Sequence, residues 1–283
     1  MLQEAQSYSD AGREREGADW WQYWTFVVSI VVQLIVLGLS FASLFFPLTD
    51  LLHKIVALEF AVQFFEFLFY LLFLYLYWKA EKSSSRGAPM FYRYYDWIFS
   101  TSAMLCSLFL AAVYLDKPCA SSADVANEYA WLFPVVIVCN LIMLYFGYVV
   151  ETGGHLGGIL TLVDDERVAN WSREKRRLWM GVGGSLFLVA AFLPIIFVMY
   201  FDFHSTWGEV LVWITFAIWA LYGVVAVYWA AEPTDLKRVE SFIANNVREK
   251  RKNAAYNILD LVSKNAMGLL LAIIAFENSN ECS

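Results

Sequence analysis

Five long stretches of this chain contain no lysine, arginine, aspartate or glutamate, and this feature limits the possible folds more than any other. They cover residues 20–49, 97–115, 129–150, 178–201 and 210–231. Each is long enough to cross a hydrocarbon core of about 30 Å, which takes about 20 helical residues. Because lipid offers no partner for exposed backbone groups, such segments cross the membrane as helices.

Two further apolar stretches have the same length but contain charges. Residues 55–78 include Glu59 and Glu66, and residues 253–276 include Asp260 and Lys264. The chain is therefore predicted to be an all-α integral membrane protein with a seven-transmembrane-helix bundle over residues 20–276. The predicted spans are about 22–46, 55–78, 91–114, 129–150, 178–201, 207–231 and 253–276, between an N-terminal segment 1–19 and a tail 277–283.

Lysine and arginine are distributed unevenly between the two ends of the predicted helices. Of the 20 in the chain, sixteen lie on the side of the N-terminus, Lys54 and Lys117 lie on the other side, and Arg93 and Lys264 lie within spans. Basic loops stay cytoplasmic. We therefore expect a multi-pass protein with a cytoplasmic N-terminus and an extracellular C-terminus. The basic runs 173–177 and 248–252 are then interpreted as membrane anchors, and no nucleic-acid partner is expected.

The remaining motifs argue against an enzyme. No hydrolytic triad, nucleotide loop or metal cluster is visible, so neither catalysis nor a bound metal is expected. The four cysteines have no metal-ligand spacing, and Cys106 and Cys139 lie inside predicted spans. Cys119 and Cys282 would lie on one side of the membrane, where a disulfide can form if the geometry allows it.

Lys264 is the most conspicuous charge inside a predicted span. An ionisable group near the middle of a bilayer costs roughly 2.5–3.5 kcal/mol on insertion scales, so its presence indicates a function. Asp260 lies four residues earlier, on the same helical face. The pair is either a structural ion pair or a lysine made nucleophilic by a desolvated pocket and able to condense with a carbonyl ligand.

The third predicted span contains a second set of polar groups. Arg93 and Asp96 are three positions apart and Ser100 follows four positions later, so the three side chains share one helical face. A carboxylate in this arrangement can offset a buried cation, and the arginine balances the carboxylate. Two such charge pairs in different spans of one chain favour a functional lysine.

These motifs resemble a known family. Arg93-Tyr94-Tyr95-Asp96-Trp97 followed by Phe99, and Asp260-Leu261-Val262-Ser263-Lys264, resemble the third- and seventh-helix signatures of microbial rhodopsins. Trp219-Ala220-Leu221-Tyr222-Gly223 resembles their sixth-helix Trp-x-x-Tyr motif, with Gly223 where a proline is usual. The resemblance covers all seven spans and is strongest in the third and seventh.

The resemblance implies a light-absorbing protein whose partners are the lipid bilayer and retinal, all-trans in the dark. Lys264 would carry retinal as a Schiff base, and Asp96 and Asp260 would form its counterion with Arg93 beside them. Ser100 and Ser263 would lie near the nitrogen. The polyene would be enclosed by side chains for which ordinary helix packing is the alternative interpretation: Trp97, Thr101, Met143, Trp219 and Tyr222.

Within this superfamily, the expected cytoplasmic N-terminus is similar to the inverted topology of heliorhodopsins. The fourth span, residues 140–147 followed by Glu151, also resembles theirs, and the resemblance implies a homodimer. Heliorhodopsins usually have glutamate where this chain has Asp96 and a small uncharged residue where it has Asp260. Their ordered external loop between the first two spans is also longer.

Two outputs of light absorption are therefore compatible with the sequence. The first is a heliorhodopsin-like photoreceptor that changes shape for a signalling partner, whose identity the sequence does not give. The second is a light-activated transporter or channel, most naturally for protons. Proton pumps of the superfamily place a second carboxylate eleven residues after the first, where this chain has Ser107. However, Glu59, Gln63 and Glu66 form a polar stripe along one face of the second span, typical of an ion pathway. The alternative interpretation is that both glutamates are protonated and hydrogen-bond to neighbouring helices.

Overall fold

The computed structural model describes residues 2–82, 92–152, 173–231 and 240–277, and in these ranges it contains helices joined by short turns. Seven of the helices are long and apolar enough to cross a membrane, which confirms the predicted all-α seven-span class. They are α1 (Leu2–Ser43), α2 (Asp50–Lys82), α3 (Arg93–Asp116), α5 (Leu132–Thr152), α7 (Arg173–Asp202), α8 (Thr206–Ala231) and α9 (Glu240–Glu277). A short helix, α4 (Ser122–Glu128), precedes α5.

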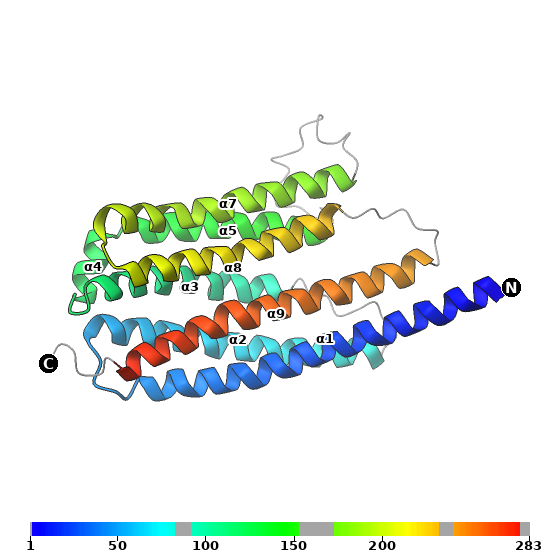
Figure 1. Cartoon of the computed structure of the whole chain (residues 1–283), viewed down its shortest axis with the longest axis horizontal. Helices are drawn as coiled ribbons and strands as arrows, with labels where there is room; N and C mark the ends of the chain where they lie inside the picture. The colour runs from blue at the N-terminus through cyan, green and yellow to red at the C-terminus, as the bar shows by residue number, and fades with distance from the viewer. Residues whose placement is uncertain (1, 83–91, 153–172, 232–239, 278–283) are drawn as a thin grey trace.

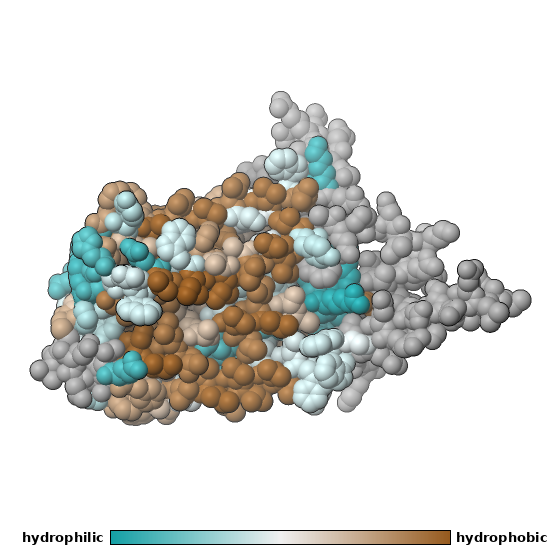
Figure 2. All heavy atoms as spheres, viewed as in Figure 1, coloured by the Kyte–Doolittle hydropathy of each residue, from teal (hydrophilic) through white to brown (hydrophobic). Residues whose placement is uncertain are grey.

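The helices lie side by side and form one closed bundle (Figure 1). α1 packs against α2 and α9, and α2 also packs against α3. α3 contacts α5 and α8. α7 packs between α5 and α8, and α8 contacts α9, which closes the ring of helices. The N-terminal end of α1 and the C-terminal end of α9 are at opposite ends of the bundle, as an odd number of crossings requires (Figure 1). On the face shown in Figure 2, hydrophobic side chains form a broad band across the middle of the bundle, with more polar described residues toward both ends.

Several helix boundaries differ from the predicted spans. α9 begins at Glu240 instead of residue 253, because the polar segment before the apolar stretch continues as helix. The fourth crossing begins at Leu132 instead of residue 129, because Tyr129 caps the C-terminal end of the separate helix α4, where its backbone N–H donates to the Val125 carbonyl. Ser121 caps the other end of α4 by accepting a hydrogen bond from the Ala123 amide at 3.2 Å. Pro134, which has no N–H donor, fits the first turn of α5.

The cysteines are divided between the helices and a connection. Cys106 in α3 and Cys139 in α5 are free. Cys119, between α3 and α4, is disulfide-bonded. Cys282, which the sequence analysis considered as its partner, is outside the described residues.

Candidate functional site

Lys264 lies in the middle of the bundle and is bound by two carboxyl groups from other helices. Its side chain is 1% exposed. The Nζ atom donates a hydrogen bond to Oδ2 of Asp96 in α3 at 2.7 Å, and Oε1 of Glu66 in α2 is 3.5 Å away. The lysine is therefore held between α2 and α3 rather than by the aspartate of its own helix.

Asp260 is instead fixed by a separate set of donors. It accepts hydrogen bonds from the Tyr70 hydroxyl at 2.9 Å, the Trp97 indole N–H at 3.1 Å and the Tyr222 hydroxyl at 2.8 Å. A guanidinium nitrogen of Arg93 is 3.9 Å from its carboxylate. The two aspartates that the sequence analysis grouped together thus have different neighbours.

Arg93 connects this cluster to α1. It donates a hydrogen bond to the Asn257 side-chain oxygen at 2.6 Å, and Asn257 donates in turn to the Thr25 hydroxyl at 2.9 Å. The guanidinium also lies 5.6 Å and 5.2 Å from the ring centroids of Trp97 and Tyr256. At these distances both aromatic faces attract the cation.

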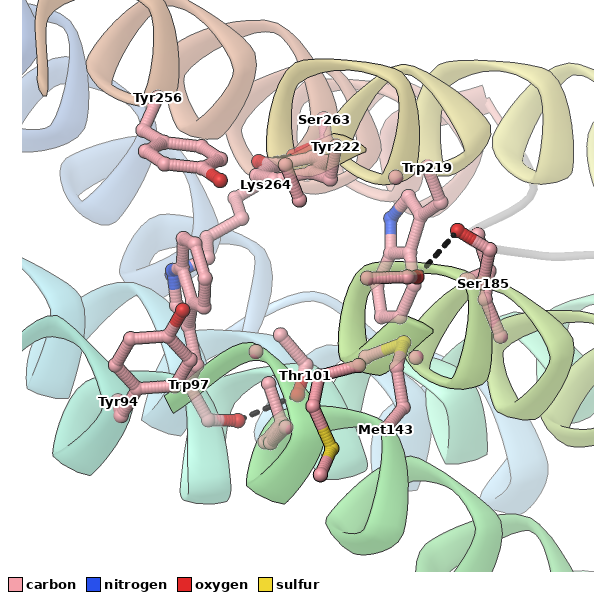
Figure 3. A pocket seen from close by; sticks show the side chains of 18 residues that line it. Tyr94, Trp97, Thr101, Met143, Ser185, Trp219, Tyr222, Tyr256, Ser263 and Lys264 are labelled. Carbon is pink, nitrogen blue, oxygen red and sulfur yellow. Dashed lines mark hydrogen bonds between the residues drawn. The ribbon is translucent and has the colours of Figure 1, made fainter. Parts of the chain in front are cut away.

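A cavity extends from Lys264 between α3, α5, α7, α8 and α9 (Figure 3). Its wall is mainly aromatic and aliphatic, with few polar side chains besides the lysine. Six of the predicted site residues line it together with Lys264: Trp97, Thr101, Met143, Trp219, Tyr222 and Ser263. Ser100 is not part of the wall; it is buried one turn after Asp96, and its hydroxyl has no hydrogen-bond partner among the described residues.

Glycines make the space in this cavity. A Cβ atom on Gly147 of α5 would be 3.0 Å from the Tyr94 hydroxyl, and one on Gly223 of α8 would be 3.1 Å from the Ser185 Oγ. Gly181 and Gly184 of α7 also line the wall. An apolar, aromatic cavity that ends on a buried lysine amine fits an elongated apolar aldehyde such as retinal.

The predicted polar stripe of α2 lies on the other side of Lys264. The Gln63 side-chain amide donates to Oε1 of Glu59 at 2.8 Å and to the backbone carbonyl of Lys264 at 3.1 Å. Ser107, the α3 position at which the sequence has no second carboxylate, donates its hydroxyl to the Met104 carbonyl of its own helix at 3.1 Å. The stripe therefore reaches the lysine at two points, through Gln63 and through Glu66.

Three residues of the site were missed by the sequence analysis: Tyr70, Tyr256 and Asn257. Tyr70 continues the spacing of Glu59, Gln63 and Glu66, so the stripe itself could have identified it. Asn257 is one turn before Asp260. The other cavity residues that sequence reasoning did not select are Tyr94, Leu144, Gly147, Met180, Gly181, Gly184, Ser185, Leu188, Gly223 and Ala226.

Comparison with known proteins identifies the class. The sequence profile of the bacteriorhodopsin-like protein family matches residues 22–278, and this chain belongs to that family. The predicted microbial rhodopsin membership is confirmed. Members of the family are mostly light-driven ion pumps or photoreceptors rather than enzymes, and they bind retinal.

Individual relatives are distant. A green-light absorbing proteorhodopsin from a gamma-proteobacterium is 25% identical over 206 residues, which cover 73% of this chain and 69% of the relative. A thermophilic rhodopsin has a similar fold, with a TM-score of 0.65, 18% identity and coverage of 94% of this chain and 96% of that one. Xanthorhodopsin, described as a light-driven ion pump with dual chromophore, has a TM-score of 0.62 and 17% identity, and the match covers 94% of this chain and 96% of that one.

Proposed function

We propose that this protein is a light-absorbing retinal protein in which Lys264 is the attachment site. The observation that carries the proposal is the Lys264 amine, buried beside Asp96 at one end of a glycine- and aromatic-lined cavity. Retinal, when bound, supplies the visible absorption, the light-driven isomerisation and a protonated nitrogen in Schiff-base linkage. The protein supplies the carboxylates that balance this nitrogen and the walls that exclude water.

The roles of the two aspartates follow from their contacts. Asp96 bonds directly to the Lys264 nitrogen, so it is the nearest negative charge for a proton held there. Asp260 is fixed by three donors and Arg93 and acts on the nitrogen from a greater distance. Trp97 and Tyr222 line the cavity and also donate hydrogen bonds to Asp260. A change in the shape of the cavity therefore alters the hydrogen bonds of the Asp260 carboxylate through these two side chains.

Substitution of the lysine tests the attachment site. The Lys264→Ala variant, expressed with added all-trans retinal, should have no visible absorption band, whereas Lys252→Ala, which removes a lysine outside the cavity on the same helix, should keep it. Circular dichroism of both variants controls for folding. A visible band in Lys264→Ala would overturn the proposal.

For the output, the first candidate is a photoreceptor that changes conformation for a signalling partner, with the inverted orientation of heliorhodopsins. The excess of basic residues on the N-terminal side supports this orientation. It predicts that the sequon Asn170-Trp171-Ser172, outside the described residues, stays unglycosylated in a eukaryotic host. A tag at the N-terminus should also be inaccessible from outside intact cells.

The heliorhodopsin resemblance also leads us to propose a homodimer. Light scattering of the purified protein tests this oligomeric state.

The second candidate, light-driven proton movement, is favoured by the position of Glu66. The cluster around Lys264 contains two cations, Lys264 and Arg93, and three carboxyl groups, Asp96, Asp260 and Glu66. Neutrality of a buried cluster requires one carboxyl to hold a proton. Neither oxygen of Glu66 accepts a hydrogen bond from a described residue, so we assign the proton to Glu66.

Photocurrent recordings separate the two outputs. In a voltage-clamped cell, light-driven proton movement gives a current that Glu66→Gln strongly reduces. A pure photoreceptor gives no current at any voltage or pH while its visible band is intact. The second result would exclude transport and leave the photoreceptor proposal standing.

A further inference from the structure

The wall of the cavity opposite Lys264 is formed by α7. The lysine is on α9, which packs on α1, α2 and α8, whereas α7 packs on α5 and α8. In the view of Figure 3, Trp219 separates Ser185 of α7 from Lys264. Retinal has its aldehyde at one end of the polyene and its ring at the other. When the aldehyde carbon bonds to Lys264, the ring therefore lies against the α7 wall.

Ser185 is the one polar side chain that α7 contributes to the cavity. The other cavity-lining residues of α7 are apolar or have no side chain: Met180, Gly181, Gly184 and Leu188. Gly223 of α8 lies next to Ser185, since a Cβ atom on this glycine would be 3.1 Å from the Ser185 Oγ. Because Gly223 has no side chain, the serine oxygen stays uncovered on this side. The α7 wall thus presents one polar side-chain atom within an apolar surface.

The Ser185 oxygen keeps the capacity to accept a hydrogen bond. Its hydroxyl donates to the backbone carbonyl of Gly181, one turn earlier in α7, at 3.0 Å. A hydroxyl has one donor hydrogen and two acceptor lone pairs, so this bond uses the hydrogen and leaves the lone pairs. Figure 3 shows the oxygen on the side of Ser185 that faces Trp219. The α7 wall therefore offers a hydrogen-bond acceptor to the end of the ligand that reaches it.

From these contacts we propose that Ser185 accepts a hydrogen bond from a hydroxyl group on the ring of the ligand, so that the site prefers a ring-hydroxylated retinal to retinal itself. The proposal rests on the proposed attachment of retinal to Lys264 and names the ligand class of that site. In a mainly apolar pocket, a few well-placed polar groups set orientation and specificity. A ring hydroxyl supplies the donor hydrogen that this acceptor requires, whereas a ring ketone has no hydrogen to donate.

The bond between Ser185 and its own helix limits the size of this preference. When unsubstituted retinal is bound, the serine hydrogen keeps the Gly181 carbonyl as its partner, so no buried donor is left unsatisfied. Retinal itself is therefore not rejected. A ring hydroxyl adds one neutral hydrogen bond, and we expect about a fivefold preference for the hydroxylated aldehyde, which is the size of one net hydrogen bond.

Competition between two aldehydes tests the proposal. The retinal-free protein is brought to equilibrium with equal amounts of all-trans retinal and all-trans 3-hydroxyretinal. The bound chromophores are then released with hydroxylamine and quantified by chromatography, with Lys264→Ala giving the background of unattached ligand. The hydroxylated chromophore should be bound in about fivefold excess. In a parallel mixture of retinal and 4-oxoretinal, the ketone should have no advantage.

The outcomes separate this proposal from the attachment site. Equal binding of retinal and 3-hydroxyretinal, or the same advantage for the ketone as for the hydroxyl, would overturn the role of Ser185 and leave the attachment to Lys264 intact. If neither aldehyde binds above the Lys264→Ala background, both proposals fail.

Two variants locate the preference at Ser185. Ser185→Ala removes the acceptor, and Gly223→Ala covers it with a Cβ atom 3.1 Å from the Oγ, so each should bring the two aldehydes to about equal binding. Because both ligands compete in one sample, the ratio does not depend on the folded fraction. Thr215→Val is the matched control and should keep the preference, because Thr215 is a buried hydroxyl of α8 that bonds to its own helix at 2.8 Å outside the cavity wall. A preference that persists in Ser185→Ala, or in Gly223→Ala where the first variant does not fold, contradicts the proposal.

Discussion

The two sides of Lys264 differ in almost every physical property. On the side of α5, α7 and α8 the lysine faces an aromatic cavity opened by glycines, with few polar atoms. On the side of α1 and α2 it faces buried carboxyl, amide and hydroxyl groups, many without a partner among the described residues. Because both sides meet at one amine, a change of shape on the apolar side can become a change of charge on the polar side.

The tyrosine and tryptophan donors of Asp260 form the connection between these sides. Trp97 and Tyr222 line the cavity, whereas Tyr70 comes from the α2 stripe. The largest effect should therefore follow from removal of the Asp260 charge. Asp260→Asn leaves the buried Arg93 without its carboxylate, and we expect a loss of about 4 kcal/mol in the free energy of unfolding.

This effect is measured by unfolding the retinal-free protein in mixed micelles of detergent and SDS. Asp124→Asn, at an exposed position of α4, is the matched control and should change the stability by less than about 0.5 kcal/mol. Equal stability of Asp260→Asn and the wild type would mean that the Asp260 carboxylate and its hydrogen bonds do not stabilise the packing of the two sides of Lys264.

The next effect concerns the apolar side alone. Gly147→Leu places atoms in the cavity and against Tyr94, so we expect a cost of up to about 3 kcal/mol and a much weaker uptake of retinal. Titration of the apoprotein with retinal, followed at the visible band, measures the uptake. Gly38→Leu is the control, because a Cβ atom there has no neighbour within 4 Å. Normal uptake by Gly147→Leu would show that the chromophore lies elsewhere.

A matching change on the polar side should leave the uptake of retinal intact. Gln63→Leu removes the amide that bonds to Glu59 and to the Lys264 carbonyl, and we expect a loss of about 2 kcal/mol in stability. The same SDS unfolding and retinal titration apply. Loss of retinal binding in this variant would contradict the separation of the two sides.

The smallest effect is expected at the boundary between the sides. Tyr222→Phe keeps the cavity wall and removes one hydroxyl, which bonds to Asp260 and, at 2.8 Å, to Ser263. We expect a loss of about 1 kcal/mol in stability, with the visible band retained at a shifted wavelength. An unchanged wavelength would mean that Asp260 has no influence on the Lys264 nitrogen.

Much of this arrangement could be predicted from the sequence, because membrane insertion makes charge unusually informative. Arg93, Asp96, Asp260 and Lys264 stand out in otherwise apolar spans, and helical spacing gives the shared face of Arg93 and Asp96. The same spacing identified the Glu59, Gln63 and Glu66 stripe. It did not show that Glu66 contacts the lysine, since spacing within one helix gives no information about the rotation of its neighbour.

The partners of these charges were less predictable. Tyr70 and Asp260 are 190 residues apart in the chain, and Asn257 and Thr25 are 232 apart, so only helix packing brings them together. The sequence also offered two equal candidates for the partner of Lys264. Packing places Oδ2 of Asp96 2.7 Å from the Lys264 Nζ atom. Asp260 instead accepts hydrogen bonds from two tyrosine hydroxyls and a tryptophan N–H.

The sequence by itself determined the seven crossings, the buried lysine and the polar face of α2, because lipid excludes charge and makes each span nearly independent of the others. The tertiary structure alone decided which carboxyl groups meet the lysine, where glycines open a cavity and that Asn257 of α9 bonds to Thr25 of α1. These features depend on the rotation and contact of helices distant in the chain, which no periodicity within one helix specifies.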